Sequence, residues 1–128
     1  MEPVTIIIML ALIEYFVMSA RVGLARGRTG VTAPAVTGND EFERHFRVHY
    51  NTLEQLVVFI PAIWCFGLFI SPLWAALVGV VFLIGRAMYA VAYVRNPDSR
   101  GPGMILSVLP CYVLVLGALG GAVWNLIG

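Results

Sequence analysis

Long apolar runs with almost no charge follow one another along this chain, and this feature constrains the fold most. Val4–Ala20 holds one charged residue, Glu14, and Met104–Ile127 holds none. A helix needs about 20 apolar residues to cross a bilayer, so these runs are close to the length of membrane spans. The composition agrees, because only 12% of the residues are charged, against about 25% in soluble domains. We therefore predict an all-α integral membrane protein, a four-helix bundle whose apolar surface faces lipid.

Helix limits follow from the apolar runs and from the residues that start or stop helices. The run Leu56–Ile70 is too short for a span, but Asn39 or Asp40 can cap a helix that reaches it through polar first turns. The glycine-rich segment Gly23–Gly38 has no apolar periodicity and is predicted to be a loop. We expect a single membrane domain, residues 1–128, with helices at about 4–22, 40–70, 73–94 and 104–127.

Arginine placement predicts the orientation in the membrane. The chain has no lysine, and its eight arginines fall in two groups: one follows the first span or opens the second helix, and the other lies late in the third span or just after it. With four spans, both groups share one side, which the positive-inside rule makes the cytoplasmic side. We therefore expect both termini on the opposite side. A net charge of +1 gives no concentrated basic face for nucleic acid.

Polar side chains form two stripes at helical spacing within the second and third helices. The first stripe consists of Arg47, Asn51, Glu54 and Gln55, and the second consists of Arg86, Tyr89 and Tyr93. Residues three, four and seven positions apart share one face of a helix. Polar groups within a membrane span are costly and usually face the interior of the bundle, where they mark a site or a pathway. We therefore expect the two stripes to converge on a shared pocket.

Three charged side chains are expected at similar depth. Glu14, Glu54 and Arg86 each lie about 10–12 Å inside the arginine-rich edge, at about 1.5 Å per residue. Two acids then compete for one arginine, so the sequence allows either a Glu54–Arg86 pair or a Glu14–Arg86 pair. It also allows a further cation, such as the ammonium group of a ligand, or water from an open cavity.

The residue types in the stripes suit a small zwitterionic peptide. Arginine binds carboxylates in a bidentate fashion, an asparagine amide offers a donor and an acceptor, and a glutamate binds an amine. A guanidinium such as that of Arg100, or a tyrosine hydroxyl, stabilises a neighbouring thiolate and lowers the pKa of the thiol from its ordinary value of about 8.5. The thiolate is the reactive nucleophile.

Two motifs resemble those of a known family. They are Glu41-Phe42-Glu43-Arg44 followed by Arg47, Asn51 and Glu54, and Gly85-Arg86 followed by Tyr89, Tyr93 and Arg100. Together with the four-helix plan, they are similar over essentially the whole chain to the membrane-associated proteins of eicosanoid and glutathione metabolism, the MAPEG family. The glutathione transferase and leukotriene synthase branch is the most similar. The resemblance implies a homotrimer that binds glutathione as co-substrate between neighbouring subunits, open to the cytoplasmic side.

The resemblance also implies a role for each matched residue. Arg47, Asn51 and Glu54 would bind glutathione from the second helix, Tyr89 and Tyr93 would line the site from the third, Arg26 would reach the ligand of the adjacent subunit, Arg86 would brace Glu54, and Arg100 would stabilise the thiolate. Two positions depart from the family pattern. Gln55, assigned here to structural support, stands where the leukotriene synthase branch has a tyrosine that contacts the ligand. Pro102 stands where the prostaglandin synthase branch has its thiolate arginine.

The expected function is that of a membrane-bound glutathione transferase, which conjugates the activated thiol to hydrophobic electrophiles from the bilayer and also reduces lipid hydroperoxides. One alternative is a non-enzymatic protein of the same fold that binds lipid or glutathione; the zwitterion-binding residues argue against it. Another is a small channel or transporter subunit in which Glu14, Glu54 and Arg86 are pathway charges. No metal site is expected, since Cys65 and Cys111 lie in apolar runs and no ligand cluster has the required spacing.

Overall fold

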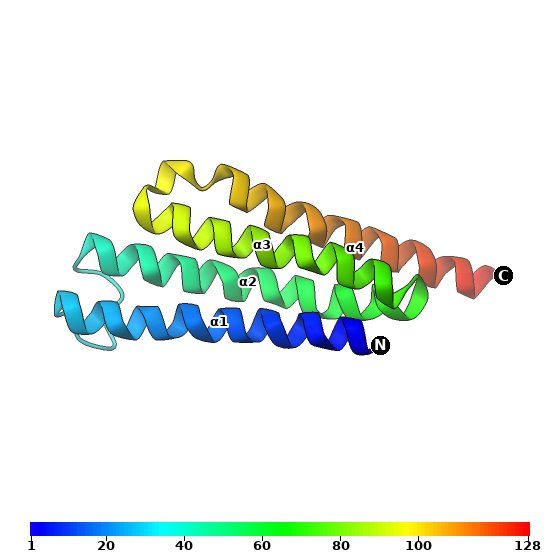
Figure 1. The fold of residues 1–128 in the computed structure, drawn as a ribbon, viewed down its shortest axis with the longest axis horizontal. Coiled ribbons are helices and arrows are strands. Elements are labelled where there is room, and N and C mark those ends of the chain that lie inside the picture. Colours follow the sequence, from blue (N-terminus) through cyan, green and yellow to red (C-terminus); the bar gives the residue numbers. More distant parts are fainter.

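The structure is a computed structural model that describes all residues, 1–128, as a bundle of four long helices (Figure 1). The helices are α1 (Glu2–Thr29), α2 (Asp40–Phe69), α3 (Pro72–Arg95) and α4 (Gly101–Ile127), and a short 3-10 turn, η1 (Pro97–Ser99), precedes α4. Each of the four long helices is long and apolar enough to cross a membrane. The prediction of an all-α integral membrane four-helix bundle is therefore confirmed.

Successive helices run in opposite directions, so both termini lie at one end of the bundle (Figure 1). The loop over residues 30–39 and the turn η1 lie at the other end, which we call the loop end. α1 and α4 each pack against both α2 and α3, whereas α1 and α4 have almost no contact with each other. The α2–α3 pair therefore forms the centre of the bundle.

α1 ends at Thr29, beyond the predicted limit near residue 22 and inside the segment that the sequence predicted to be a loop. The reason is tertiary packing: Val22 and Ala25 are buried against Phe42 of α2, so α1 has an apolar contact beyond its longest apolar run. The helix stops where Gly30 adopts a left-handed conformation with a φ of 75°, which glycine accepts without steric cost.

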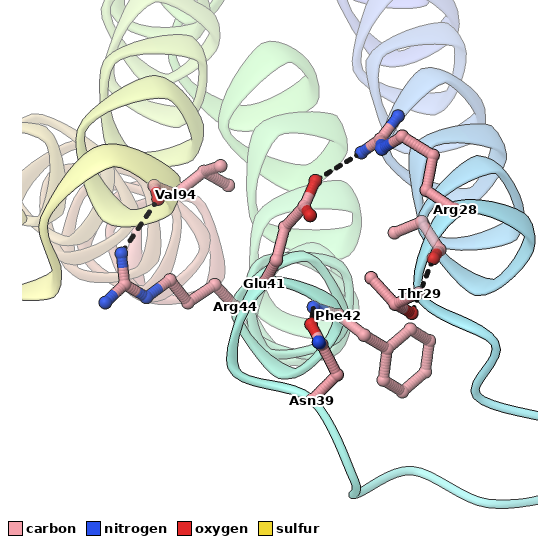
Figure 2. Close-up of polar contacts among 8 residues, drawn as sticks. Arg28, Thr29, Asn39, Glu41, Phe42, Arg44 and Val94 are labelled. Carbon is pink, nitrogen blue, oxygen red and sulfur yellow. Dashed lines mark hydrogen bonds and ion pairs between the residues drawn. The ribbon is translucent and has the colours of Figure 1, made fainter.

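The starts of α2 and α4 follow local rules. The side chain of Asn39 accepts a hydrogen bond of 3.1 Å from the backbone N–H of Phe42 and so caps α2 (Figure 2). Asn39 is thus the cap, of the two candidates that the sequence offered. α4 begins at Gly101 rather than near residue 104, and Pro102 lies in its first turn. A proline is tolerated there, because backbone N–H groups of the first turn have no acceptor within the helix.

Polar contacts join the helices at the loop end (Figure 2). Arg28 of α1 forms an ion pair with Glu41 of α2, at 2.6 Å. Arg44 of α2 donates a hydrogen bond of 3.2 Å to the backbone carbonyl of Val94 in α3. α2 is therefore tied to α1 and to α3 at the loop end, where many polar residues of the sequence gather.

Apolar side chains fill the interior and also cover the outside of the bundle. At the centre, Phe59 of α2 stacks on Phe82 of α3 with ring centroids 3.8 Å apart, and both side chains are fully buried. Large apolar side chains such as Phe16 and Leu116 point outward and are exposed. A continuous apolar exterior is unfavourable in water but matches the hydrocarbon of a membrane.

Two glycines let α3 and α4 approach closely beside the loop end. A Cβ atom at Gly85 would lie 2.5 Å from the backbone carbonyl carbon of Leu106, and a Cβ atom at Gly103 would collide with the backbone of Tyr89. Only glycine permits backbones to come this close. The contact places Tyr89 directly beside the first turns of α4.

Candidate functional site

A pocket of about 310 Å³ opens near the loop end, between α2, α3 and the start of α4. Its wall consists of Arg47, Tyr50, Asn51, Glu54, Tyr89, Tyr93, Arg100 and Met104. The structure thus gathers around one cavity most of both polar stripes, all but Gln55 and Arg86, together with Arg100, although these residues come from three different segments. This convergence was the main expectation for the site.

α2 supplies half of the residues in the wall of the pocket. Arg47, Asn51 and Glu54 follow one another at helical spacing and share one face, while Val48 and Thr52 on the other side of α2 are buried in the bundle. Arg47 and Glu54 are exposed in the single chain and form no ion pair or hydrogen bond with another side chain. The pocket wall therefore offers the unpaired cation of Arg47 and the unpaired carboxylate of Glu54, which lie about two helical turns apart along α2.

Arg86 lies beneath this pocket rather than in its wall. Its side chain is fully buried, and its Nη2 donates hydrogen bonds to Oδ1 of Asn51 at 2.8 Å and to Oγ1 of Thr52 at 3.1 Å. Because a guanidinium carries only donors, the amide of Asn51 must turn its oxygen toward Arg86. The NH2 group of Asn51 is then the part that remains for a ligand.

This arrangement corrects the expected contact between Arg86 and Glu54. No ion pair within 4.0 Å joins Arg86 to Glu54 or to Glu14. The guanidinium instead contacts α2 at Asn51 and Thr52, where neutral oxygens supply acceptors inside the bundle. Spacing along the helices placed Arg86 and Glu54 at the same depth, but it could not show that Glu54 faces outward.

Two tyrosines of α3 line the pocket opposite α2. Tyr89 is buried, and the guanidinium carbon of Arg86 lies 4.4 Å from the centroid of its ring. Tyr93, one turn further along, stacks on Tyr89 with ring centroids 5.5 Å apart. Arg86, Tyr89 and Tyr93 thus form one stack, and the two tyrosines carry it into the wall of the pocket.

Arg100 closes the pocket at the start of α4. It is the residue immediately before that helix and is exposed, and its Nη1 donates a hydrogen bond of 2.9 Å to the backbone carbonyl of Pro97. The first turn of a helix presents unpaired N–H groups and a partial positive charge. A negative group held between Arg100 and Met104 would meet both the guanidinium and this helix end.

Besides Arg86, two residues that the sequence assigned to the site, Arg26 and Gln55, do not line the pocket of their own chain. Arg26 belongs to the last turns of α1 rather than to a loop, and its Nη1 donates a hydrogen bond of 2.6 Å to the backbone carbonyl of Ala35. Gln55 points toward α4, where its Oε1 is the acceptor for Sγ of Cys111 at 3.9 Å. Gln55 therefore contacts α4, whereas Arg26 does not line the pocket of its own chain.

Sequence reasoning missed two residues of the wall, Tyr50 and Met104. Tyr50 lies three positions after Arg47, and Met104 lies four positions after Arg100. Helical spacing from residues already singled out was therefore the signal that could have found both.

The chemistry of the pocket is that of a site for a zwitterion. Guanidinium, amide and phenol groups supply donors for carboxylate, carbonyl or thiolate groups, and the carboxylate of Glu54 is an acceptor for an ammonium group. No group of three His, Cys, Asp or Glu side chains able to hold a metal ion gathers in the chain. Both cysteines are free thiols.

Comparison with known proteins gives a consistent assignment. The sequence profile of the MAPEG family matches residues 4–120. An uncharacterized protein of Synechocystis is 45% identical, over 91% of this chain and 85% of its own length. Microsomal glutathione S-transferase 2 of Homo sapiens is 38% identical, over 84% of this chain and 72% of its own length. Leukotriene C4 synthase of Bos taurus is 36% identical, over 80% of this chain and 69% of its own length.

Proposed function

Because the chain belongs to the MAPEG family, we propose that it is a membrane-bound glutathione transferase, which activates the glutathione thiol and conjugates it to hydrophobic electrophiles. Relatives with names of this kind, a glutathione S-transferase and a leukotriene C4 synthase, support a glutathione-related activity. The observation that carries the proposal is the pocket itself. In it, the polar groups of α2 and α3, together with Arg100 just before α4, offer partners for each part of a zwitterionic thiol peptide.

Glutathione is a tripeptide with two carboxylates, one ammonium group, two peptide groups and a thiol. In the proposed complex Arg47 binds a carboxylate, Glu54 binds the ammonium group, and the NH2 group of Asn51 donates to a peptide carbonyl or carboxylate. Tyr89 and Tyr93 complete the wall from α3. Arg86 acts only through Asn51, since it is buried and holds the amide in one orientation.

Arg100 is the proposed catalytic residue. Its guanidinium and the first turn of α4 favour the negative thiolate over the neutral thiol, so the thiol releases its proton to water at lower pH than in solution. The sulfur lone pair then forms a bond to carbon of the electrophile, and the leaving group departs with the displaced electron pair. An electrophile with a double bond instead takes up a proton, and the thioether is again the product.

Reduction of lipid hydroperoxides follows from the same thiolate. Its sulfur attacks the terminal oxygen of the hydroperoxide, the O–O bond breaks, and the lipid leaves as an alcohol after protonation. A second glutathione attacks the resulting sulfenic acid, which gives glutathione disulfide and water. Two glutathione molecules are thus oxidised for each hydroperoxide that is reduced.

The proposed active form is a homotrimer, with glutathione bound between neighbouring subunits. Arg26 does not reach the pocket of its own chain, so we assign it to the ligand of an adjacent subunit. Glutathione enters from the cytoplasmic side, at the loop end, and the hydrophobic electrophile enters from the bilayer. Both termini then lie on the opposite side of the membrane.

A conjugation assay on the purified protein tests this function. Wild-type protein in detergent should form conjugate from glutathione and a generic aromatic electrophile, and Arg95→Ala should do the same, because Arg95 lies outside the pocket. Arg47→Ala should lose most of the activity at low glutathione concentration. Stoichiometric glutathione binding without conjugation of any electrophile would instead favour the non-enzymatic binding protein. Ion flux across liposome membranes that is unaffected by added glutathione would favour a channel or transporter subunit.

A further inference from the structure

A second cavity, of about 240 Å³, lies between α1 and α3, and it shares no wall residue with the pocket described above. We call it the α1–α3 groove. Most of its wall is apolar and includes Val17 of α1 and Ala87 and Val91 of α3. These three side chains are exposed in the chain, so the groove opens on the outer surface of the bundle at membrane depth.

The end of the groove nearest the loop end is basic. Arg21 and His45 line both the groove and an adjoining hollow that also contains Arg28. Arg28 is already paired with Glu41, whereas Arg21 is exposed and forms no ion pair or hydrogen bond within the chain. Arg21 therefore offers a free cation at the place where the apolar surface of α1 meets its polar end.

A carboxyl group lies deeper in the groove. Glu14 lines the same groove seven residues before Arg21, about 10 Å further from the loop end at about 1.5 Å per residue. The groove therefore has its exposed cation at one end and a mostly apolar wall further in. This polarity fixes the direction in which an amphiphile can lie: its negative group is at Arg21 and its apolar part runs along α3.

We propose that the α1–α3 groove binds an anionic phospholipid of the surrounding leaflet, with its phosphate at Arg21 and His45 and an acyl chain along Ala87 and Val91. A membrane lipid already holds its phosphate at the membrane edge and its chains at the depth of the apolar wall. Free phosphate lacks the chain. The ammonium group of phosphatidylcholine would add positive charge beside the unpaired Arg21, so an anionic head group is favoured.

Lipid retention by the purified protein tests the site. Delipidated wild-type protein is mixed with micelles that contain phosphatidylglycerol or phosphatidylcholine with identical chains, and bound lipid is counted by native mass spectrometry. We expect preferential retention of phosphatidylglycerol. Arg21→Gln should weaken it about fivefold, the usual effect of one basic side chain near an anionic lipid surface. Ala87→Phe should weaken it independently, by filling the apolar part of the groove.

Two variants serve as matched controls. Arg95→Gln removes another exposed arginine at the loop end, and Ala20→Phe adds the same bulk to an exposed position of α1; neither residue lines the groove. Both should retain phosphatidylglycerol like the wild type. Glutathione affinity should be the same in all four variants, because none of these residues lines the other pocket.

Three results of the comparison between phospholipids and variants would overturn the proposal. They are equal retention of the two phospholipids, wild-type retention by both Arg21→Gln and Ala87→Phe, and loss of retention in the controls as large as in the test variants. Retention of oleate or inorganic phosphate without phosphatidylglycerol would also reject it, since the site would then be specific for a free anion and not for a lipid.

Discussion

The buried guanidinium of Arg86 donates a hydrogen bond of 2.8 Å to Oδ1 of Asn51, and this contact links the interior of the bundle to the wall of the pocket. Without Arg86, the side-chain amide of Asn51 could present either its oxygen or its NH2 group to the pocket. Arg86 removes this freedom, because it presents only donors and is itself packed over Tyr89. In the proposed complex, the buried Arg86 therefore orients the Asn51 amide so that its NH2 group faces glutathione.

Asn51→Asp separates these two roles of the amide. The carboxylate can still accept a hydrogen bond from Arg86, but it offers no donor to the ligand and repels the ligand's carboxylates. We expect glutathione affinity to fall by at least about tenfold while the midpoint of thermal unfolding is maintained. Calorimetric titration and thermal unfolding in detergent measure the two effects. Asn125→Asp, at the exposed end of α4, is the matched control, and an Asn51→Asp variant that binds normally would contradict the assignment.

Glu54→Ala and Arg47→Ala each remove one charged partner of the proposed zwitterion. Charge-assisted hydrogen bonds contribute roughly 1.5–3 kcal/mol each, so calorimetry should show Kd values at least about tenfold higher. Glu43→Ala removes an acid from the same helix outside the pocket and should leave Kd unchanged. If Glu54→Ala behaves like Glu43→Ala, Glu54 does not belong to the site.

Arg100→Ala tests activation separately from binding. The variant should bind glutathione nearly as well as the wild type but should lose most of the ultraviolet thiolate band at neutral pH, because the main positive charge beside the sulfur is gone. Arg95→Ala, five residues earlier and outside the pocket, should keep the band. An unchanged band in Arg100→Ala would mean that another group stabilises the thiolate.

Gly103→Ala tests the close approach of α3 and α4. The added methyl group would collide with the backbone of Tyr89, and such overpacking typically lowers the free energy of unfolding by about 1–3 kcal/mol. Gly101→Ala adds the same methyl group two positions earlier, where nothing lies within 4 Å, and should leave unfolding almost unchanged. Equal stability of the two variants would show that α3 and α4 can separate without cost.

The sequence predicted the membrane helices well because the bilayer imposes simple requirements. A span must be largely apolar and must satisfy its own backbone hydrogen bonds, so three apolar runs indicated three of the helices directly. For the second helix, a capping residue at Asn39 or Asp40 was also needed, because the run Leu56–Ile70 is short. Where a helix leaves the membrane, this rule no longer applies. The end of α1 at Thr29 depends on the packing of Val22 and Ala25 against Phe42. This is a tertiary contact, which no local sequence pattern predicts.

The pocket could be predicted to a similar extent. Helical spacing placed Arg47, Asn51 and Glu54 on one face, and the structure brings that face together with Tyr93 and Arg100. Spacing fixes depth and face, but it does not fix the rotation of one helix against the next.

For this reason, the partners of Arg86 were not predictable. A guanidinium on a long side chain can reach several groups of the facing helix, and only the packed bundle shows that Asn51 and Thr52 are the ones within reach. The position of Arg26 in α1, and not in a loop, has a similar origin, since it depends on the true end of α1.

A titration of the purified wild-type protein with glutathione, followed by the ultraviolet absorbance of the thiolate at neutral pH, tests the central claim most directly. We predict a saturable thiolate band that decays when an aromatic electrophile is added, while conjugate forms in equal amount. Saturable binding that leaves the thiol protonated, or no saturable binding at all, would contradict the claim that this pocket binds and activates glutathione.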